Sequence, residues 1–207
     1  PVAPAAHFMI GGVTTDIEGR STLEGLYACG EVASTGVHGA NRLGSNSLLE
    51  GLVFGERVAR QLLHPVPGGP LRPAETLEVA LPARTGRGNE EGQLDLIRDT
   101  LWDEVGIVRY AAGLRSALGT FERILAAAEP TSDDGIPGPL ANAALTGSFI
   151  ARAALTRTES RGAHFRSDRP KKQAAWQHHL GLVLARRPSP ARRGPATRVM
   201  RRKSSPS

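Results

Sequence analysis

The sequence predicts two folded parts in series, an α/β segment and then an all-α helical bundle, from three observations. The apolar run Leu26–Cys29 lies between glycines and has the length of a central strand. Residues 47–63, and three stretches after residue 92, place apolar side chains at helical spacing. Residues 64–92 between them are rich in proline and glycine, so we expect a linker there.

Within the α/β segment, residues 1–63, we expect a strand or strand-turn over residues 7–15. Glu31 follows the strand predicted over Leu26–Cys29, at the edge where open α/β sheets bind ligands. The helix over residues 47–63 is expected to start with a capping box formed by Ser47 and Glu50. Any remaining free N–H groups of its first turn would favour an anion.

The bundle is expected over residues 93–170. Its first helix includes Leu94–Trp102, a second begins at 105 or 107 and ends near 128, and a third covers 140–158, after a break at 130–139. Trp102, Tyr110 and Phe121 are expected in its core. Within the linker, residues 77–81 form a strand-like island.

The charge of the chain is unevenly distributed. A net charge of +6 and a pI of about 10.4 suggest a nucleic-acid binder. All 20 acidic residues, however, precede Lys171, so the body is mildly acidic and the excess positive charge belongs to the tail. We expect the tail, residues 171–207, to be basic and disordered, and to arise from a frame-shifted or misjoined end. A tail that binds nucleic acid or a membrane surface is the alternative.

The single cysteine, Cys29, excludes an internal disulfide and fits a reducing compartment, so we expect a cytoplasmic protein. In the predicted strand it would be a small buried apolar residue. No stretch approaches the roughly 18 apolar residues of a membrane span, so we expect no membrane partner.

Three stretches together resemble the succinate dehydrogenase and fumarate reductase flavoprotein superfamily: His7–Val13, Gly25–Glu31 and His38–Arg42. The segment Gly30–His38 is most similar to the L-aspartate oxidase family. The respiratory subunits usually carry Gly-Glu-Cys-Ala at its start and aspartate in place of Glu50. Glu159–Pro170 also has the superfamily pattern, and we interpret its charges as a mutually paired structural knot that pins the bundle.

This resemblance implies that residues 1–63 are the C-terminal part of an FAD-binding domain. It implies FAD-dependent oxidation of L-aspartate to iminoaspartate, with O2 or fumarate as acceptor, as the first step of NAD biosynthesis. L-aspartate or another small dicarboxylate is the expected ligand, and quinolinate synthase is a candidate partner. No metal is expected, and nucleic acid is disfavoured as a partner.

The resemblance also assigns roles to individual residues. Arg42 and His7 are the expected catalytic residues, and each contacts one substrate carboxylate. Glu31 is expected to accept hydrogen bonds from FAD hydroxyl groups. Ser47 and Leu48 are expected to bind the flavin ring through backbone N–H groups. His38 is expected to shape the loop rather than to contact substrate.

The chain departs from the superfamily in one respect. The family's Gly-x-Gly-x-x-Gly turn, which holds the FAD pyrophosphate, does not occur in it, and the family's proton-transferring arginine lies upstream of this segment. We therefore expect a C-terminal portion of a flavoenzyme that is inactive alone. A succinate dehydrogenase or fumarate reductase fragment is one alternative, and a helical module with a nucleic-acid-binding tail is another.

Overall fold

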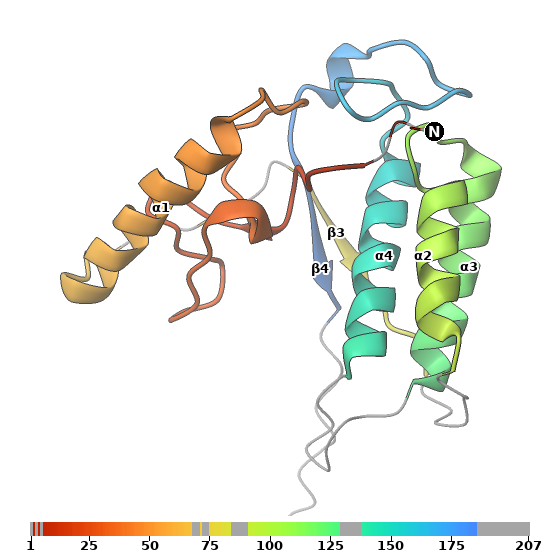
Figure 1. Ribbon diagram of the computed structural model, residues 1–207, viewed down its shortest axis with the longest axis horizontal. Helices are drawn as coiled ribbons and strands as arrows, with labels where there is room; N and C mark the ends of the chain where they lie inside the picture. The colour runs from red at the N-terminus through yellow and green to blue at the C-terminus, as the bar shows by residue number, and fades with distance from the viewer. Residues whose placement is uncertain are drawn as a thin grey trace, which may run out of the picture.

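The computed structural model describes residues 2, 4, 6–67, 71, 75–83, 91–128 and 138–185. Figure 1 shows the long helix α1 (Asn46–Leu63) with its surrounding loops on one side and a bundle of three helices on the other. Strands β3 (Glu75–Val79) and β4 (Leu180–Leu184) lie between them. This arrangement agrees with an α/β segment that precedes a helical bundle.

The α/β segment is built around one short parallel pair, β1 (Val13–Thr14) with β2 (Ala33–Ser34). The short 3-10 helix η1 (Gly30–Val32) leads into β2 and packs against α1. Gly12 has φ +143°, and a Cβ there would lie 2.1 Å from the carbonyl oxygen of Val32. Only glycine permits this close passage of two backbones.

The strand predicted over Leu26–Cys29 is wrong. Tyr27 forms only an isolated antiparallel bridge with Arg20, and no other strand flanks it within the described residues. An apolar run needs a hydrogen-bonding neighbour to become a strand, and periodicity does not reveal whether one is present. Cys29 is accordingly half-buried in extended backbone before η1, and it does not lie in a buried strand.

Helix α1 forms as predicted, but its capping box does not. The helix begins at Asn46 after Ser45, which has φ 70° and makes no side-chain cap hydrogen bond. Ser47 therefore lies inside the first turn, and Glu50 is buried and turned toward other partners. Most leucine and valine side chains of the predicted apolar face are exposed among the described residues: Leu48, Leu49, Leu52, Val53, Leu62 and Leu63.

The bundle consists of α2 (Gln93–Glu104), α3 (Ala111–Ala127) and α4 (Pro139–Thr156). Its core contains fully buried Leu114 and Phe121 of α3 against small residues of α4. A Cβ at Gly147 would lie 3.0 Å from the Phe121 ring, so α4 approaches α3 closely because that position has no side chain.

The sequence placed some bundle residues wrongly. Phe121 is buried as expected, but Trp102 and Tyr110 are 58% and 44% exposed, so their assignment to the core is wrong. Large aromatic rings favour burial on average, and helical spacing alone does not fix which face is inward. Helix α3 begins only at Ala111, because residues 105–108 form a bend between α2 and α3. The predicted break at 130–139 lies mostly outside the described residues.

The predicted disorder of the tail is wrong over residues 171–185. This stretch contains the 3-10 helix η2 (Ala174–Trp176) and β4, which pairs in parallel with β3 inside the predicted linker. Pairing with β3 and hydrogen bonds to the end of α4 order it, and composition reveals neither. The remainder of the tail, 186–207, lies outside the described residues, and the domain boundaries remain predictions. Among the described helices, none has the length and apolarity needed to cross a bilayer.

Candidate active site

Arg42 lies on the loop that precedes α1 and is held by two neutral groups. Its Nη1 donates to the hydroxyl of Ser47 at 2.8 Å, and its guanidinium carbon lies 4.5 Å from the centre of the Phe8 ring. Within the described residues it forms no ion pair. A guanidinium has five N–H donors, so one hydroxyl partner leaves donors for an incoming carboxylate.

His7 precedes the phenyl ring that lies beneath Arg42. His7 is thus placed near Arg42 by its neighbour Phe8, and the side chain of His7 is exposed. No hydrogen bond of His7 occurs among the described residues. The pocket found nearby is lined by Ile10, Thr35, His38 and other residues, but by neither His7 nor Arg42. Their joint hold on one substrate therefore stays a prediction.

A buried polar cluster joins the Arg42 loop to α1. The Nε2 atom of His38 lies 2.8 Å from Oε2 of Glu50, and their side chains are only 8% and 2% exposed. The hydroxyl of Thr35 donates to the other Glu50 oxygen. The His38 and Phe8 rings also meet in a T-shaped contact, with their centres 5.2 Å apart. His38 thus tethers the loop, in keeping with the structural role expected for it.

His38 has a second polar atom with a different environment. Its Nδ1 is buried and has no hydrogen-bond partner among the described residues. Since the Glu50 carboxylate is an acceptor, Nε2 carries the proton in a neutral ring and Nδ1 is then an acceptor. His38 lines the same pocket as Gly36 and His179, so the Arg42 loop also faces the C-terminal segment.

The residues expected to bind FAD lie on η1 and at the start of α1, which pack together. Glu31 is exposed, and its Oε1 accepts a hydrogen bond from the Met9 amide at 2.9 Å. The Ser47 hydroxyl accepts from Arg42, and the Leu48 amide donates to the Ser45 carbonyl at 3.2 Å. The Leu48 side chain is 74% exposed.

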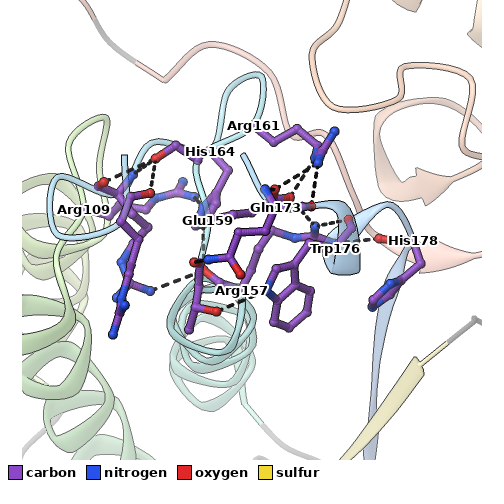
Figure 2. A network of polar contacts seen from close by, with 12 residues as sticks. Arg109, Arg157, Glu159, Arg161, His164, Gln173, Trp176 and His178 are labelled. Carbon is purple, nitrogen blue, oxygen red and sulfur yellow. Dashed lines mark hydrogen bonds and ion pairs between the residues drawn. The ribbon is translucent and has the colours of Figure 1, made fainter. Parts of the chain in front are cut away.

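A network centred on Glu159 closes the C-terminal end of the bundle (Figure 2). Glu159 is fully buried and accepts from Arg161 at 2.7 and 2.9 Å, from the Gln173 amide at 2.7 Å and from Arg157 at 3.0 Å. The Arg161 guanidinium is the largest cause that holds the pKa of Glu159 at about 2, against the opposing effect of burial. The charges are mutually satisfied, which confirms the predicted structural knot.

Arg166 forms a second part of the same knot. It is 2% exposed, makes a two-pronged contact with Asp168 at 2.8 and 2.7 Å, and donates to the Ala154 carbonyl at the end of α4. The hydrogen bond from Arg166 lowers the pKa of Asp168 to about 2. Asp168 also accepts from the Ala111 amide at 3.3 Å, so this pair caps α4 and α3 together.

His164 is a neutral member of the knot. Its Nδ1 accepts from Arg109 at 2.9 Å, and its Nε2 lies 3.2 Å from the Arg157 carbonyl, so Nε2 carries the proton. Burial, reinforced by neighbouring arginines, lowers its pKa to about 4. This histidine is therefore built into the structure as an uncharged ring.

Sequence reasoning did not single out three contributors. Phe8 lies in the motif that begins at His7, and an aromatic ring next to a candidate site histidine is the signal that could have identified it. The buried Glu50 was assigned to a cap, although a lone carboxylate on a leucine-rich face suggests a buried partner. Gly162 has φ +58° and packs on the Ala40 carbonyl. No local pattern in the sequence predicts that long-range contact.

Two family models match separate parts of the chain. A model described as an FAD binding domain matches residues 1–48, which contain His7, Glu31 and Arg42. A model described as the C-terminal part of the fumarate reductase flavoprotein matches residues 138–192. This second match continues through Lys171 to residue 192, so a frame-shifted or misjoined end at Pro170 is wrong.

Individual relatives agree with these models. The chain is 45% identical over 184 residues to L-aspartate oxidase of Rhodospirillum rubrum, covering 86% of this chain and 61% of that one. It is 39% identical over 170 residues to the Pyrococcus furiosus L-aspartate oxidase, covering 82% and 32%. The structure of Mycobacterium smegmatis Sdh1 in complex with UQ1 matches with a TM-score of 0.60 at 31% identity, covering 83% of this chain and 32% of that chain.

The chain belongs to the succinate dehydrogenase and fumarate reductase flavoprotein superfamily. Within it, the curated relatives described above are L-aspartate oxidases, and the chain is similar to a portion of them. It spans 61% of the Rhodospirillum rubrum relative and about a third of the Pyrococcus furiosus one.

The superfamily implies FAD as the cofactor, and the residues present fit such a group. Helix α1 starts without a side-chain cap, so its first turn offers amide dipoles to an electron-rich ring edge. Exposed Leu43 and Leu48 flank that start and offer apolar surface to a flat ring. Glu31 keeps one carboxylate oxygen beyond its bond to Met9 for a cofactor hydroxyl.

Proposed function

We propose that this chain forms the substrate-holding part of an FAD-dependent L-aspartate oxidase that produces iminoaspartate. The observation that carries this proposal is the state of Arg42, which is held by Phe8 and Ser47 and has no carboxylate partner among the described residues. Similarity to named L-aspartate oxidases over most of the chain supports the same reading.

Arg42 and His7 are assigned the two carboxylates of L-aspartate. The fork of Arg42 pairs with a carboxylate through two parallel N–H bonds, a geometry that lysine does not reproduce. The contact between its guanidinium and Phe8 fixes the plane of that fork. A ring N–H of His7, exposed one residue from Phe8, donates to the second carboxylate.

Bound FAD supplies the electron acceptor for the substrate Cα–H bond. Around it, Glu31 accepts from cofactor hydroxyls, and the amides of Ser47 and Leu48 favour negative charge near the ring. Because the Leu48 amide already donates to Ser45 at 3.2 Å, its bond to the cofactor would be shared between two acceptors.

The remaining assignments belong to the same proposal. O2 or fumarate reoxidises the flavin, the reaction opens NAD biosynthesis, and the protein works in the cytoplasm with quinolinate synthase as a candidate partner. The names of the relatives support the reaction. The lone, half-buried Cys29 agrees with a reducing compartment.

The proposal is tested in a chimera, because the chain spans only part of its relatives. Residues 1–185 replace the matching segment of the Pyrococcus furiosus relative, and anaerobic bleaching of bound flavin is recorded with L-aspartate and with succinate. We expect bleaching by L-aspartate and little by succinate. Bleaching by succinate alone would favour a succinate dehydrogenase type of flavoprotein. A chimera that holds FAD but responds to neither substrate would contradict the proposal.

A further inference from the structure

The loop that carries Arg42 is bonded to the C-terminal segment at Ala40, and His179 of that segment lies near Gly36. The Ala163 amide donates to the Ala40 carbonyl at 2.9 Å. Gly162 has φ +58°, and a Cβ there would lie 2.0 Å from the same carbonyl oxygen. At the other end of the loop, a Cβ on Gly36 would lie 3.8 Å from Nε2 of His179. Residues far apart in the sequence therefore bond Ala40 and lie beside Gly36.

These two contact points are anchored to the end of α4. Gly162 follows Arg161, which is paired with the buried Glu159. His179 follows His178, whose carbonyl accepts from Arg157 at 2.7 Å. Arg157 also donates to the Trp176 carbonyl at 2.8 Å, and its guanidinium lies 5.1 Å from the centre of that residue's ring (Figure 2). Gly162 and His179 are thus each one residue from a group bonded within the knot.

The opposite side of the loop is fixed to α1. His38 bonds the buried Glu50, and Arg42 bonds Ser47 in the first turn. The loop lies between these bonds and the C-terminal contacts, and Arg42 is two residues from Ala40. A shift of Ala40 would move Arg42 unless the bonds to α1 held it alone.

We infer that Gly162 and His179 are positioning residues, which set the place of the Arg42 loop through Ala40 and Gly36. The charged knot of residues 157–168 then has a task beyond bundle stability, because it seats the loop that holds the substrate. The catalytic meaning of this inference rests on the function proposed above. The positioning itself is a property of this chain and is measurable without flavin or substrate.

The test is amide hydrogen exchange of the full chain, read by mass spectrometry on peptides from residues 36–47 and from α3 and α4. Gly162→Ala forces the new Cβ against Ala40, so we expect exchange in 36–47 to rise about tenfold with α3 and α4 unchanged. Gly92→Ala is the matched control, because Gly92 has φ +72° and nothing within 4 Å of a new Cβ. It shares the backbone strain without the contact.

An unchanged rate in 36–47 for a folded Gly162→Ala variant would overturn the inference. An equal rise in the loop and in both helices would also overturn it, since that marks general destabilisation. If Gly162→Ala does not fold, His179→Ala decides, because that exposed side chain is removed at little cost to folding. We expect faster exchange confined to the residues around Gly36, and no change there would overturn the inference.

Discussion

At the residue scale, Arg42, which we propose holds the substrate, and the structural Arg166 differ in the groups that surround them. Arg166 is buried, pairs with both oxygens of Asp168 and donates to backbone carbonyls at the end of α4. Arg42 is half-buried and has a hydroxyl and a phenyl ring as neighbours. Both occur in superfamily motifs, and the resemblance assigns Arg42 to the substrate and Arg166 to the knot, but the sequence does not show which groups each guanidinium contacts. The difference lies in which guanidinium donors are already used.

The knot makes stability depend on pH in two windows. His164 titrates at its ordinary 6.5 when unfolded but has a pKa of about 4 when folded, so the unfolded state binds protons first. Stability therefore falls as pH drops from about 6.5 to 4, by on the order of 2 kcal/mol once solvent screening of the half-buried ring is allowed for. Glu159 has an ordinary pKa of 4.5 and a folded pKa of about 2, so its contribution is lost between those values.

Urea unfolding at a series of pH values checks this expectation. His164→Gln should flatten the fall in unfolding free energy between pH 6.5 and 4, and leave the steeper loss below pH 4.5 in place. A fall of equal slope in the variant and the original chain would show that His164 is not its cause.

At the scale of the elements, the packing of the bundle depends on the close approach of α3 and α4. Fully buried Ala144 and Ala151, with Gly147, form a face of α4 that admits the Phe121 ring. Helical periodicity predicted that these helices exist and that Phe121 is buried. It did not predict that Trp102 is exposed, because a three-helix bundle leaves one face of each helix in water.

Gly147→Ala should destabilise the bundle by about 1 kcal/mol, since the enclosed Phe121 ring cannot move away from a Cβ at 3.0 Å. Gly119→Ala is the control within α3, where a new Cβ meets nothing within 4 Å. It should stabilise by up to about 1 kcal/mol through helix propensity. Thermal unfolding measures both variants, and equal shifts of the same sign would contradict the packing argument.

Contacts between distant segments define the fold at the scale of the whole molecule. β3 pairs with β4 across about half the chain, and the C-terminal segment bonds Arg157, Glu159 and the Arg42 loop. The sequence predicted the helices, because helical spacing is a local pattern, and the superfamily resemblance predicted the charged knot; the role of the Arg42 loop stays a prediction. Sequence reasoning failed at the strand over Leu26–Cys29 and at the tail, because each depends on a partner elsewhere in the chain.

Two truncations test the role of the tail. Removal of residues 171–207 leaves Glu159 without the Gln173 amide and Arg157 without two carbonyl partners. We expect a loss of roughly 3 kcal/mol, because buried charges lose hydrogen bonds. Removal of 186–207 leaves these contacts in place and should cost less. Equal unfolding free energies for the two shortened chains would contradict the structural role of residues 171–185.

The most direct measurement is the anaerobic rate of flavin reduction by L-aspartate in the chimera carrying Arg42→Lys. We predict that the second-order rate constant of flavin reduction falls about 30-fold, equivalent to about 2 kcal/mol, with FAD content unchanged. Arg57→Lys is the matched control, because Arg57 also lies over a phenyl ring and donates to a carbonyl. Flavin in the Arg57→Lys chimera should be reduced by L-aspartate at the same rate as in the unsubstituted chimera. Equal rates in both variants, or loss of FAD with Arg42→Lys, would contradict the assignment of Arg42 to the substrate.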